Sequence, residues 1–285
     1  MRIGIDTYSF HRMLGLLRDG EDATADRIDR DERGAIALAA EFGVDVVAAQ
    51  TCFLPAPPRV DVSACVRAAA PAELVPSWGA PNGLEFGANP GAAAELDWWI
   101  DASAEAGCRL LRIVLGGPAM RGLEPDAVRT ERSLPVLHRA ADRAARQGVR
   151  LAIENHGDTA AAHVADILHR LSHPSLGSCF DTANALRTGD DPVEAARILA
   201  PWVLMLHLKD VEPLDRQLSH VTGPCSVPYG DGIVPIVRVL EVLAAPIAAG
   251  APVCVELGQL PRGADERALI DASLDWLRRR ALTPR

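Results

Sequence analysis

Four apolar runs in the second half of the chain end in side chains that can bind a divalent metal ion or transfer a proton. Those side chains are Glu154 with His156, Asp181 with Asn184, His207 with Lys209, and Glu256. Carboxylates and an imidazole suit a hard or borderline ion such as Mn²⁺, Mg²⁺, Co²⁺ or Zn²⁺. Crowded carboxylates repel one another unless a cation lies among them, so convergence of the four ends predicts a metal site.

Side-chain alternation supports that convergence. A single carboxylate at a strand end more often caps a helix, and a single histidine more often has a structural hydrogen bond. Residues two apart in a strand share a face, which predicts an inward polar layer of Glu154, Asp181, His207 and Glu256 above Ala152, Cys179, Met205 and Cys254. The opposite faces carry larger apolar residues for helices to cover: Leu151, Ile153, Phe180, Leu204, Leu206, Leu208, Val253, Val255 and Leu257.

Short β-like runs alternate with longer helical ones along the chain, which is typical of βα units in a parallel sheet. Four further strands are expected near 2–8, 44–50, 73–78 and 109–115, although Pro76 disfavours the third. Eight helices are expected near 32–42, 62–70, 92–106, 126–147, 160–171, 192–199, 235–249 and 265–280. The sequence therefore predicts one α/β domain over residues 1–285, a single (β/α)₈ TIM barrel with its active site at the C-terminal mouth of the strands.

An open, doubly wound sheet is the rival fold. The first strand is not followed by the G-x-G-x-x-G turn that holds a dinucleotide in such sheets. We therefore favour the barrel and expect no nucleotide cofactor.

Composition narrows the possible partners. The 29 basic and 38 acidic residues give a net charge of -9, so no nucleic-acid partner is expected. Six scattered cysteines without a C-x-x-C pair favour reduced thiols. The N-terminus enters a strand pattern directly and no apolar stretch reaches the ~18 residues of a membrane span, so a cytoplasmic protein without membrane association is expected.

The same polar residues carry a resemblance to a known family. The chain resembles the xylose isomerase-like TIM barrel superfamily of sugar phosphate isomerases and epimerases in the motifs Ile153-Glu154-Asn155-His156-Gly157, Phe180-Asp181-Thr182-Ala183-Asn184, His207-Leu208-Lys209-Asp210 and then Glu256. That superfamily includes ketose 3-epimerases, inosose dehydratase, dehydroshikimate dehydratase and, more remotely, apurinic endonucleases. The resemblance implies one divalent metal ion, Mn²⁺ before Mg²⁺, Co²⁺ or Zn²⁺, bound by Glu154, Asp181, His207 and Glu256.

The resemblance also implies that Glu154 and Glu256 form an acid/base pair on opposite faces of a substrate carbon. A metal-dependent sugar or keto-polyol isomerase or epimerase is therefore expected, which removes a proton next to a carbonyl through a metal-stabilised enediolate. The alternative is a lyase or dehydratase of the inosose, dehydroshikimate or 3-keto-glycoside type, because ejection of a β-hydroxyl starts from the same intermediate. The ligands alone do not choose between these outcomes.

Departures from the family pattern bear on the substrate. Asn184 stands where ketose 3-epimerases usually have a histidine, and Pro213 where they usually have an arginine. We therefore expect a small polyol, keto-sugar or cyclic substrate, with candidate contacts at His156, Asn184, Lys209, Tyr8, Gln50 and Trp78.

Two basic residues have further interpretations. Lys209 has an alternative role as the ion-pair partner of Asp210 or Glu212, and Arg112 is expected to face inward and pair with a carboxylate. Homo-oligomerisation is left open.

Overall fold

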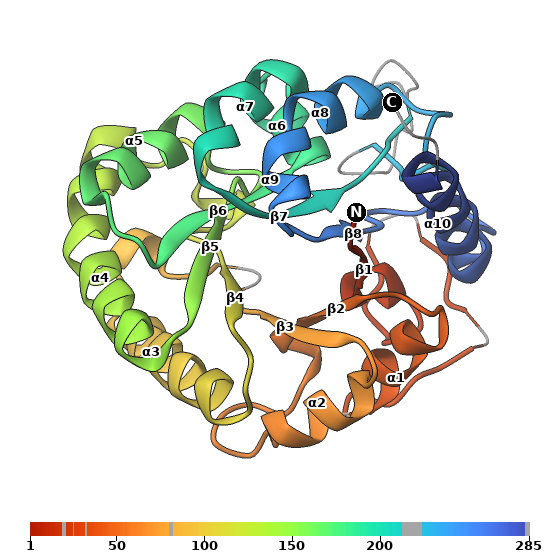
Figure 1. The fold of residues 1–285 in the computed structure, drawn as a ribbon, viewed down its shortest axis with the longest axis horizontal. Helices are drawn as coiled ribbons and strands as arrows, with labels where there is room; N and C mark the ends of the chain where they lie inside the picture. Colours follow the sequence, from red (N-terminus) through yellow and green to blue (C-terminus); the bar gives the residue numbers. More distant parts are fainter. Residues whose placement is uncertain (19–20, 25, 32, 80–81, 213–223, 283–285) are drawn as a thin grey trace.

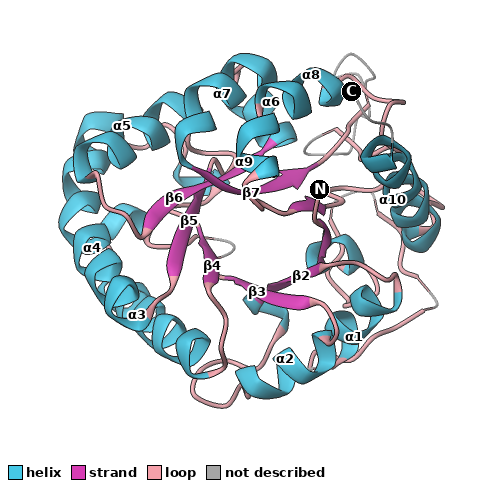
Figure 2. Ribbon diagram, in the orientation of Figure 1, coloured by secondary structure: helices cyan, strands magenta, loops and turns pink. Residues whose placement is uncertain are grey.

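The computed structural model describes residues 1–18, 21–24, 26–31, 33–79, 82–212 and 224–282. Eight parallel strands close into a barrel in sequence order, because β8 pairs with β1 as well as with β7 (Figure 1). Helices surround the strands on the outside (Figure 2). The predicted (β/α)₈ barrel is therefore confirmed, while its extent as one domain over residues 1–285 stays a prediction.

The strands expected near 2–8, 44–50, 73–78 and 109–115 are each shorter in the structure. Tyr8, expected at the end of the first strand, lies in the 3-10 turn Thr7–Phe10. The third strand forms despite Pro76. It pairs with the second strand along its length and with the fourth strand at Ser77, opposite Arg112. The bounds are β1 Ile3–Asp6, β2 Val46–Gln50, β3 Glu73–Ser77, β4 Leu110–Ile113, β5 Arg150–Glu154, β6 Leu176–Asp181, β7 Val203–Leu208 and β8 Val253–Val255.

The described residues form ten α-helices, two more than the sequence predicts. One addition starts immediately after β6, where the Asp181 carboxylate caps the backbone N–H of Asn184. The other arises because the helix expected at 235–249 divides at Leu243, shortly before Pro246, which cannot donate a backbone hydrogen bond. The helices are α1 Gly34–Glu41, α2 Val62–Ala69, α3 Pro90–Glu105, α4 Asp126–Gln147, α5 Ala161–Leu171, α6 Thr182–Thr188, α7 Pro192–Leu199, α8 Ile236–Val242, α9 Ala244–Ala248 and α10 Glu266–Leu282.

Two apolar clusters confirm the predicted faces of the strands. The cluster inside the barrel consists of Val46, Ala48, Val75, Leu110, Ala152, Cys179, Met205 and Cys254. The predicted outward residues belong to the larger cluster between the strands and the helices, except Leu204, which packs against the inner cluster. The register of β6 against β7 shifts between Ser178 and Cys179, close to this exception. The inner cluster forms the floor beneath the polar strand ends.

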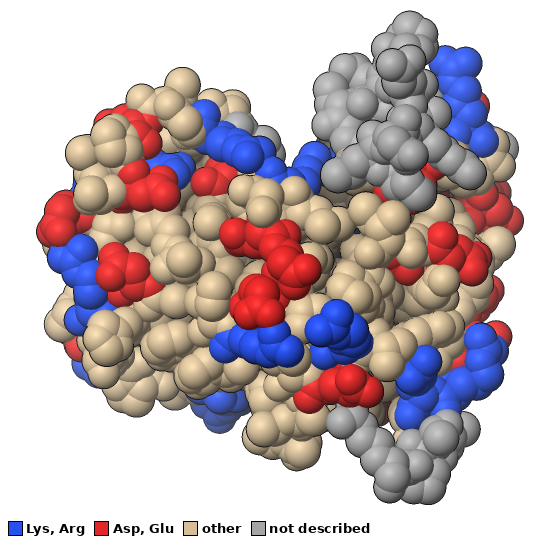
Figure 3. All heavy atoms as spheres, turned by 90° about the horizontal axis from the view of Figure 1, so that it is seen from above, with Lys and Arg blue, Asp and Glu red and all other residues tan. Residues whose placement is uncertain are grey.

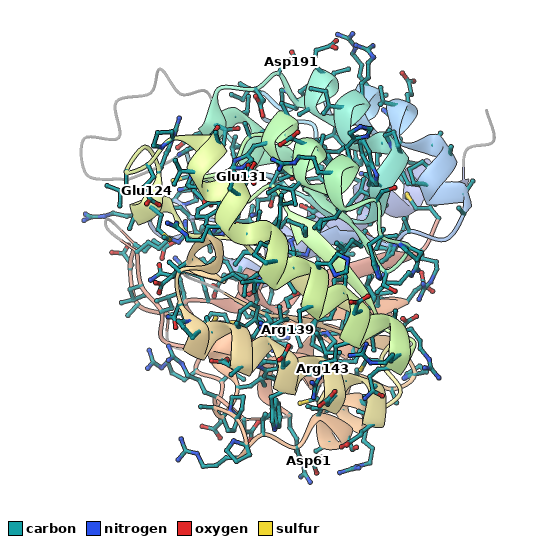
Figure 4. All side chains as sticks on the ribbon, turned by 90° about the vertical axis from the view of Figure 1, so that its left-hand side faces the viewer. Asp61, Glu124, Glu131, Arg139, Arg143 and Asp191 are labelled. Carbon is teal, nitrogen blue, oxygen red and sulfur yellow. The ribbon has the colours of Figure 1, made fainter. Side chains whose placement is uncertain are left out.

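The surface is held by ion pairs between helices. Arg139 and Arg143 of α4 extend toward α3 (Figure 4), where they pair with Asp97 and Asp101. On the face shown in Figure 3, acidic and basic side chains are interspersed. All six cysteines are free thiols, as predicted. None of the described helices has both the length and the apolar character that a membrane crossing requires.

Gly4 makes room for the inner cluster. A Cβ atom at this position would lie 2.6 Å from the Cys254 sulfur and 2.8 Å from the Val46 carbonyl oxygen. Neither neighbour can withdraw easily, because both belong to paired strands of the closed barrel. Interiors are packed too tightly to absorb even one added methyl group here.

We predict that Gly4→Ala lowers the free energy of unfolding by roughly 1–3 kcal/mol through overpacking. Urea unfolding followed by circular dichroism measures the change. Gly258→Ala is the matched control, because its added Cβ would meet the nearest atom, Ser226 Oγ, at an ordinary 3.6 Å. Equal stability of Gly4→Ala and the wild type would contradict the close packing described.

Candidate metal centre

Four buried side chains meet at the C-terminal ends of β1, β5, β7 and β8. The His207 imidazole lies at their centre, with Nδ1 3.3 Å from Glu154 Oε2 and 2.7 Å from Glu256 Oε2. Its other nitrogen, Nε2, lies 3.4 Å from Asp6 Oδ2. All four residues are at most 4% exposed. Three of the four predicted ligands therefore surround one point, together with an aspartate that the prediction omitted.

Asp181, the fourth predicted ligand, joins this group through Lys209. The Lys209 ammonium lies 2.6 Å from Asp181 Oδ2 and 2.9 Å from Glu256 Oε1. The alternative partners proposed for this lysine are therefore wrong. The carboxylates of Asp210 and Glu212 instead accept backbone N–H groups of the loop from 224 to 234.

Glu154 has hydrogen bonds at both carboxylate oxygens. Arg112 of β4 faces inward and donates to Oε2, as the sequence predicts, and Asn184 donates to Oε1 over 2.9 Å. The arginine is 1% exposed and also contacts the Trp78 carbonyl. Glu154 therefore has a fixed orientation and a permanent counter-charge.

The ionisation of these groups follows from burial and from their charged neighbours. Burial opposes the charged form of Glu256, but the positive charges of Lys209 and His207 outweigh it and lower its pKa to about 2. For Asp6, burial and then the Glu256 charge raise the pKa to about 6. Burial opposes the ionised Glu154 as well, yet Arg112 holds its pKa well below the usual range. The two glutamates are thus carboxylates at neutral pH.

The donor set fits a divalent cation. Two groups of side chains have ligand atoms within 4.8 Å of one another, namely Glu154, Cys179 and His207, and Asp6, His207 and Glu256. Within the described part of the chain, both ring nitrogens of His207 and Glu256 Oε2 are buried without a well-formed hydrogen bond. Burial raises the pKa of the Cys179 thiol to about 11, which disfavours a thiolate ligand. An ion at this point would therefore meet carboxylates and the imidazole, the donors that the sequence predicts.

Several predicted substrate contacts border this centre. The Asn184 amide contacts Glu154, and Gln50 donates from its amide nitrogen to Asp6 over 3.3 Å. The partly exposed Tyr8 hydroxyl accepts hydrogen bonds from Arg18. His156 is half-buried beside Asp158, 3.5 Å from its carboxylate.

Trp78 does not belong with these residues. Ser77 takes the inward position at the end of β3 and donates to Asp6, so the next side chain points outward. The Trp78 indole packs in the outer apolar cluster and donates to Glu95 of α3. We therefore correct the prediction that Trp78 contacts substrate at the centre. Pro213, the other departure from the family pattern, lies outside the described residues.

The residue that sequence reasoning missed is Asp6. It ends β1 with the same inward parity as Glu154, so alternation along Gly4 and Asp6 was the available signal. Its run is short and its carboxylate also caps the turn at Tyr8, which is the ordinary role of an aspartate there. The sequence-based prediction therefore included four polar strand ends and omitted a fifth, the end of β1.

Comparisons with known proteins agree with this architecture. A sequence model of the xylose isomerase-like TIM barrel family matches residues 36–280. An inosose dehydratase from Geobacillus kaustophilus (strain HTA426) is 34% identical over 120 residues, which span 38% of this chain and 39% of that enzyme.

Two solved structures resemble the whole fold. The D-psicose 3-epimerase of Clostridium cellulolyticum H10 has 18% identity and a TM-score of 0.68, with 98% of this chain and 99% of that chain covered. A probable 3-DHS dehydratase of Bacillus anthracis has 14% identity and a TM-score of 0.67, with 98% and 99% covered. At these identities, the likeness demonstrates a shared fold.

We predict that Arg112→Met lowers the free energy of unfolding by about 3–5 kcal/mol, because it leaves Glu154 as an uncompensated buried charge. The added change Glu154→Gln should recover part of this loss. Urea unfolding of the wild type, both single variants and the double variant forms a double-mutant cycle. Strictly additive effects would contradict direct coupling between the two side chains.

We also predict that Mn²⁺ stabilises the wild type against thermal unfolding, by about 2.7 kcal/mol at 100 times its dissociation constant. His207→Ala should abolish this stabilisation because it removes the central donor. His156→Ala serves as the control, since its ring belongs to neither group of ligand atoms. Retained stabilisation in His207→Ala would place the ion elsewhere.

Proposed function

The chain belongs to the xylose isomerase-like TIM barrel family, and on that basis we propose that it is a divalent-metal-dependent isomerase or epimerase of a sugar or keto-polyol. The observation that carries this proposal is the placement of two buried, ionised glutamates around one imidazole at the barrel mouth. Such a pair can remove a proton next to a carbonyl and return one from another direction.

Glu154, Asp181, His207 and Glu256 are the proposed ligands, with Asp6 as an additional donor. Asp181 belongs to the ligand set by family resemblance, while its carboxylate contacts Lys209. A bound divalent ion, Mn²⁺ in our proposal, would supply positive charge for the oxygen of the substrate carbonyl as the adjacent carbon loses its proton. The chemistry therefore calls for a substrate with a carbonyl next to a C–H bond.

The two glutamates differ in what surrounds them. Glu256 Oε2 has no well-formed hydrogen bond within the described residues, so it can accept a proton from carbon. Glu154 is held at both oxygens by Arg112 and Asn184, so its position changes little. We propose that Glu256 removes the proton. In an isomerase, Glu256 then returns that proton to the neighbouring carbon. In an epimerase, the ionised Glu154 takes a proton from solvent and delivers it from the opposite side, and Glu256 releases its own to solvent, because the two residues stand on strands separated by β6 and β7.

We propose that Lys209 and Asn184 bind substrate hydroxyl groups. Gln50, Tyr8 and His156 are proposed as further substrate contacts at the edge of the site. Lys209 is 9% exposed and touches both Asp181 and Glu256, so its ammonium can donate to an oxygen at the reacting carbon. These donors favour a small, hydroxyl-rich molecule.

A dehydratase is the second candidate function. It is favoured by the partial match to an inosose dehydratase, which is 34% identical over 120 residues. In such a reaction the same proton would be removed, and a neighbouring hydroxyl would then leave as water.

Solvent exchange tests the proposal. We expect Mn²⁺-loaded protein in D₂O to place deuterium on the carbon next to the carbonyl of at least one member of a panel of ketoses, keto-inositols and 3-keto-glycosides. NMR and mass spectrometry detect exchange without loss of water for an isomerase or epimerase. An unsaturated ketone would assign the dehydratase instead, and indifference to EDTA would refute metal dependence.

Glu256→Gln should reduce this exchange by about 10²-fold or more, the range of a general acid or base contribution. Glu266→Gln is the matched control, because Glu266 is a buried glutamate that pairs with Arg12 away from the centre. A similar loss in both variants would indicate general damage to the barrel.

A further inference from the structure

A second, cationic feature adjoins the acidic centre. Arg18 from the loop after β1 and Arg187 from α6 line one pocket together with Lys209. The rest of its wall consists of the apolar residues Ala183, Val211 and Pro224 and of Asn184, Ser226, Gly258 and Gln259. Because Asn184 and Lys209 also contact the acidic carboxylates, the pocket and the centre share a wall.

Within the described parts of the chain, neither guanidinium group in this pocket forms an ion pair, although the charges of Asp181 and Glu256 act on Arg187 from farther away. Among the residues that the structure describes, no carboxylate lies within 4 Å of the guanidinium nitrogens of Arg18 or Arg187. Arg18 donates both of its side-chain hydrogen bonds to the neutral Tyr8 hydroxyl, over 3.0 and 2.6 Å. Among the described acidic residues, Glu21 lies nearest to Arg18 along the chain, and its carboxylate bonds to His11 and to backbone N–H groups. The positive charge of the pocket is therefore available to a ligand.

The charged form of Arg187 is unfavourable at this position. Burial, and then the like charge of Arg18, lower its pKa below the usual range. Some arginines at helix surfaces have carboxylate partners, as Arg143 and Arg170 do. The charges of Asp181 and Glu256 act in the opposite direction on this pKa but do not outweigh burial and Arg18, so the position is unfavourable for an arginine that has no further anion beside it.

The pocket is small. Its volume of about 40 Å³ admits roughly two or three water-sized groups. A carboxylate or a phosphate headgroup matches that size, whereas a sugar ring does not. Arginine suits such anions because its planar fork donates two parallel hydrogen bonds.

We propose that Arg18 and Arg187 bind a compact anionic group, a carboxylate or phosphate, of the substrate whose carbonyl carbon lies at the acidic centre. The inference rests on the proposed function and narrows its substrate to keto-sugar acids or phosphorylated keto-sugars. The anionic group enters the pocket while the carbon chain extends over Lys209 toward Glu256. Arg18 and Arg187 position the substrate and do not themselves touch the reacting carbon.

Binding to the Mn²⁺-loaded protein tests this proposal with three compounds of one carbon skeleton. D-fructose is neutral, D-fructuronate carries a carboxylate at C6, and D-fructose 6-phosphate carries a phosphate there. Calorimetric titration at 0.15 M KCl should give at least tenfold tighter binding for one of the two anions. The preferred anion identifies the group, and equal or tighter binding of D-fructose would overturn the proposal.

Variants of the two arginines show whether tighter anion binding comes from this pocket or from the metal ion. Arg187→Gln should weaken binding of the preferred anion by about 10- to 100-fold, the worth of hydrogen bonds to a charged group, and leave D-fructose binding within about twofold. Arg18→Gln should act in the same direction, and Arg187→Lys should recover only part of the loss. Arg197→Gln on α7 is the control, because this exposed arginine pairs with Glu194 outside the pocket.

Equal weakening for the neutral and anionic compounds in Arg187→Gln would show a structural role and overturn the proposal. Because these are binding measurements, they remain informative even if no compound exchanges deuterium. Absence of exchange with preserved anion preference would count against the proposed reaction alone. Exchange of neutral compounds without anion preference would count against the pocket alone.

Discussion

Repulsion among buried carboxylates is the constraint on which the barrel mouth depends. Asp6, Glu154, Asp181 and Glu256 are nearly excluded from water, and the chain compensates them with Arg112 and Lys209 from two other strand ends. When His207 is neutral, the form that binds a metal, four negative and two positive side chains leave a formal charge of about -2, which a divalent ion would balance. Arg112 and Lys209 thus reduce the repulsion among the buried carboxylates. They leave enough negative charge to attract a metal ion.

The closed barrel holds these carboxylates close together. Glu154, Asp181 and Glu256 each stand at the end of a strand whose lower residues belong to the inner apolar cluster, so the position of these acids follows from strand pairing rather than from a flexible loop. Gly4 has no side chain where the cluster is tightest. The closed sheet therefore positions ligands within a few ångströms of one another although they are far apart in sequence.

Alternation with period two made most of this predictable from sequence. It placed Glu154, His207 and Glu256 on one inward layer, because that inference needs only local parity and a closed sheet. It could not assign the partner of Lys209, since Asp210 is adjacent in sequence but accepts hydrogen bonds from a loop, whereas Asp181 and Glu256 come from other strands. Trp78 was misplaced although alternation applies to β3 as well: Val75 and Ser77 face inward, so the Trp78 side chain lies on the outer face with Leu74. Arg18 and Arg187 gave no signal, because their proximity depends on how a loop and a short helix meet.

Asp181 has a double attachment whose consequence reaches beyond the centre. One carboxylate oxygen contacts Lys209, and the other caps α6, the short helix that carries Asn184 and Arg187. Residues 181–188 therefore join a proposed ligand, the start of a helix and two proposed substrate contacts in one short segment. A substitution at Asp181 would remove the cap of α6 together with the partner of Lys209, so the first residue of this segment meets two unrelated demands while the side chains farther along the helix do not.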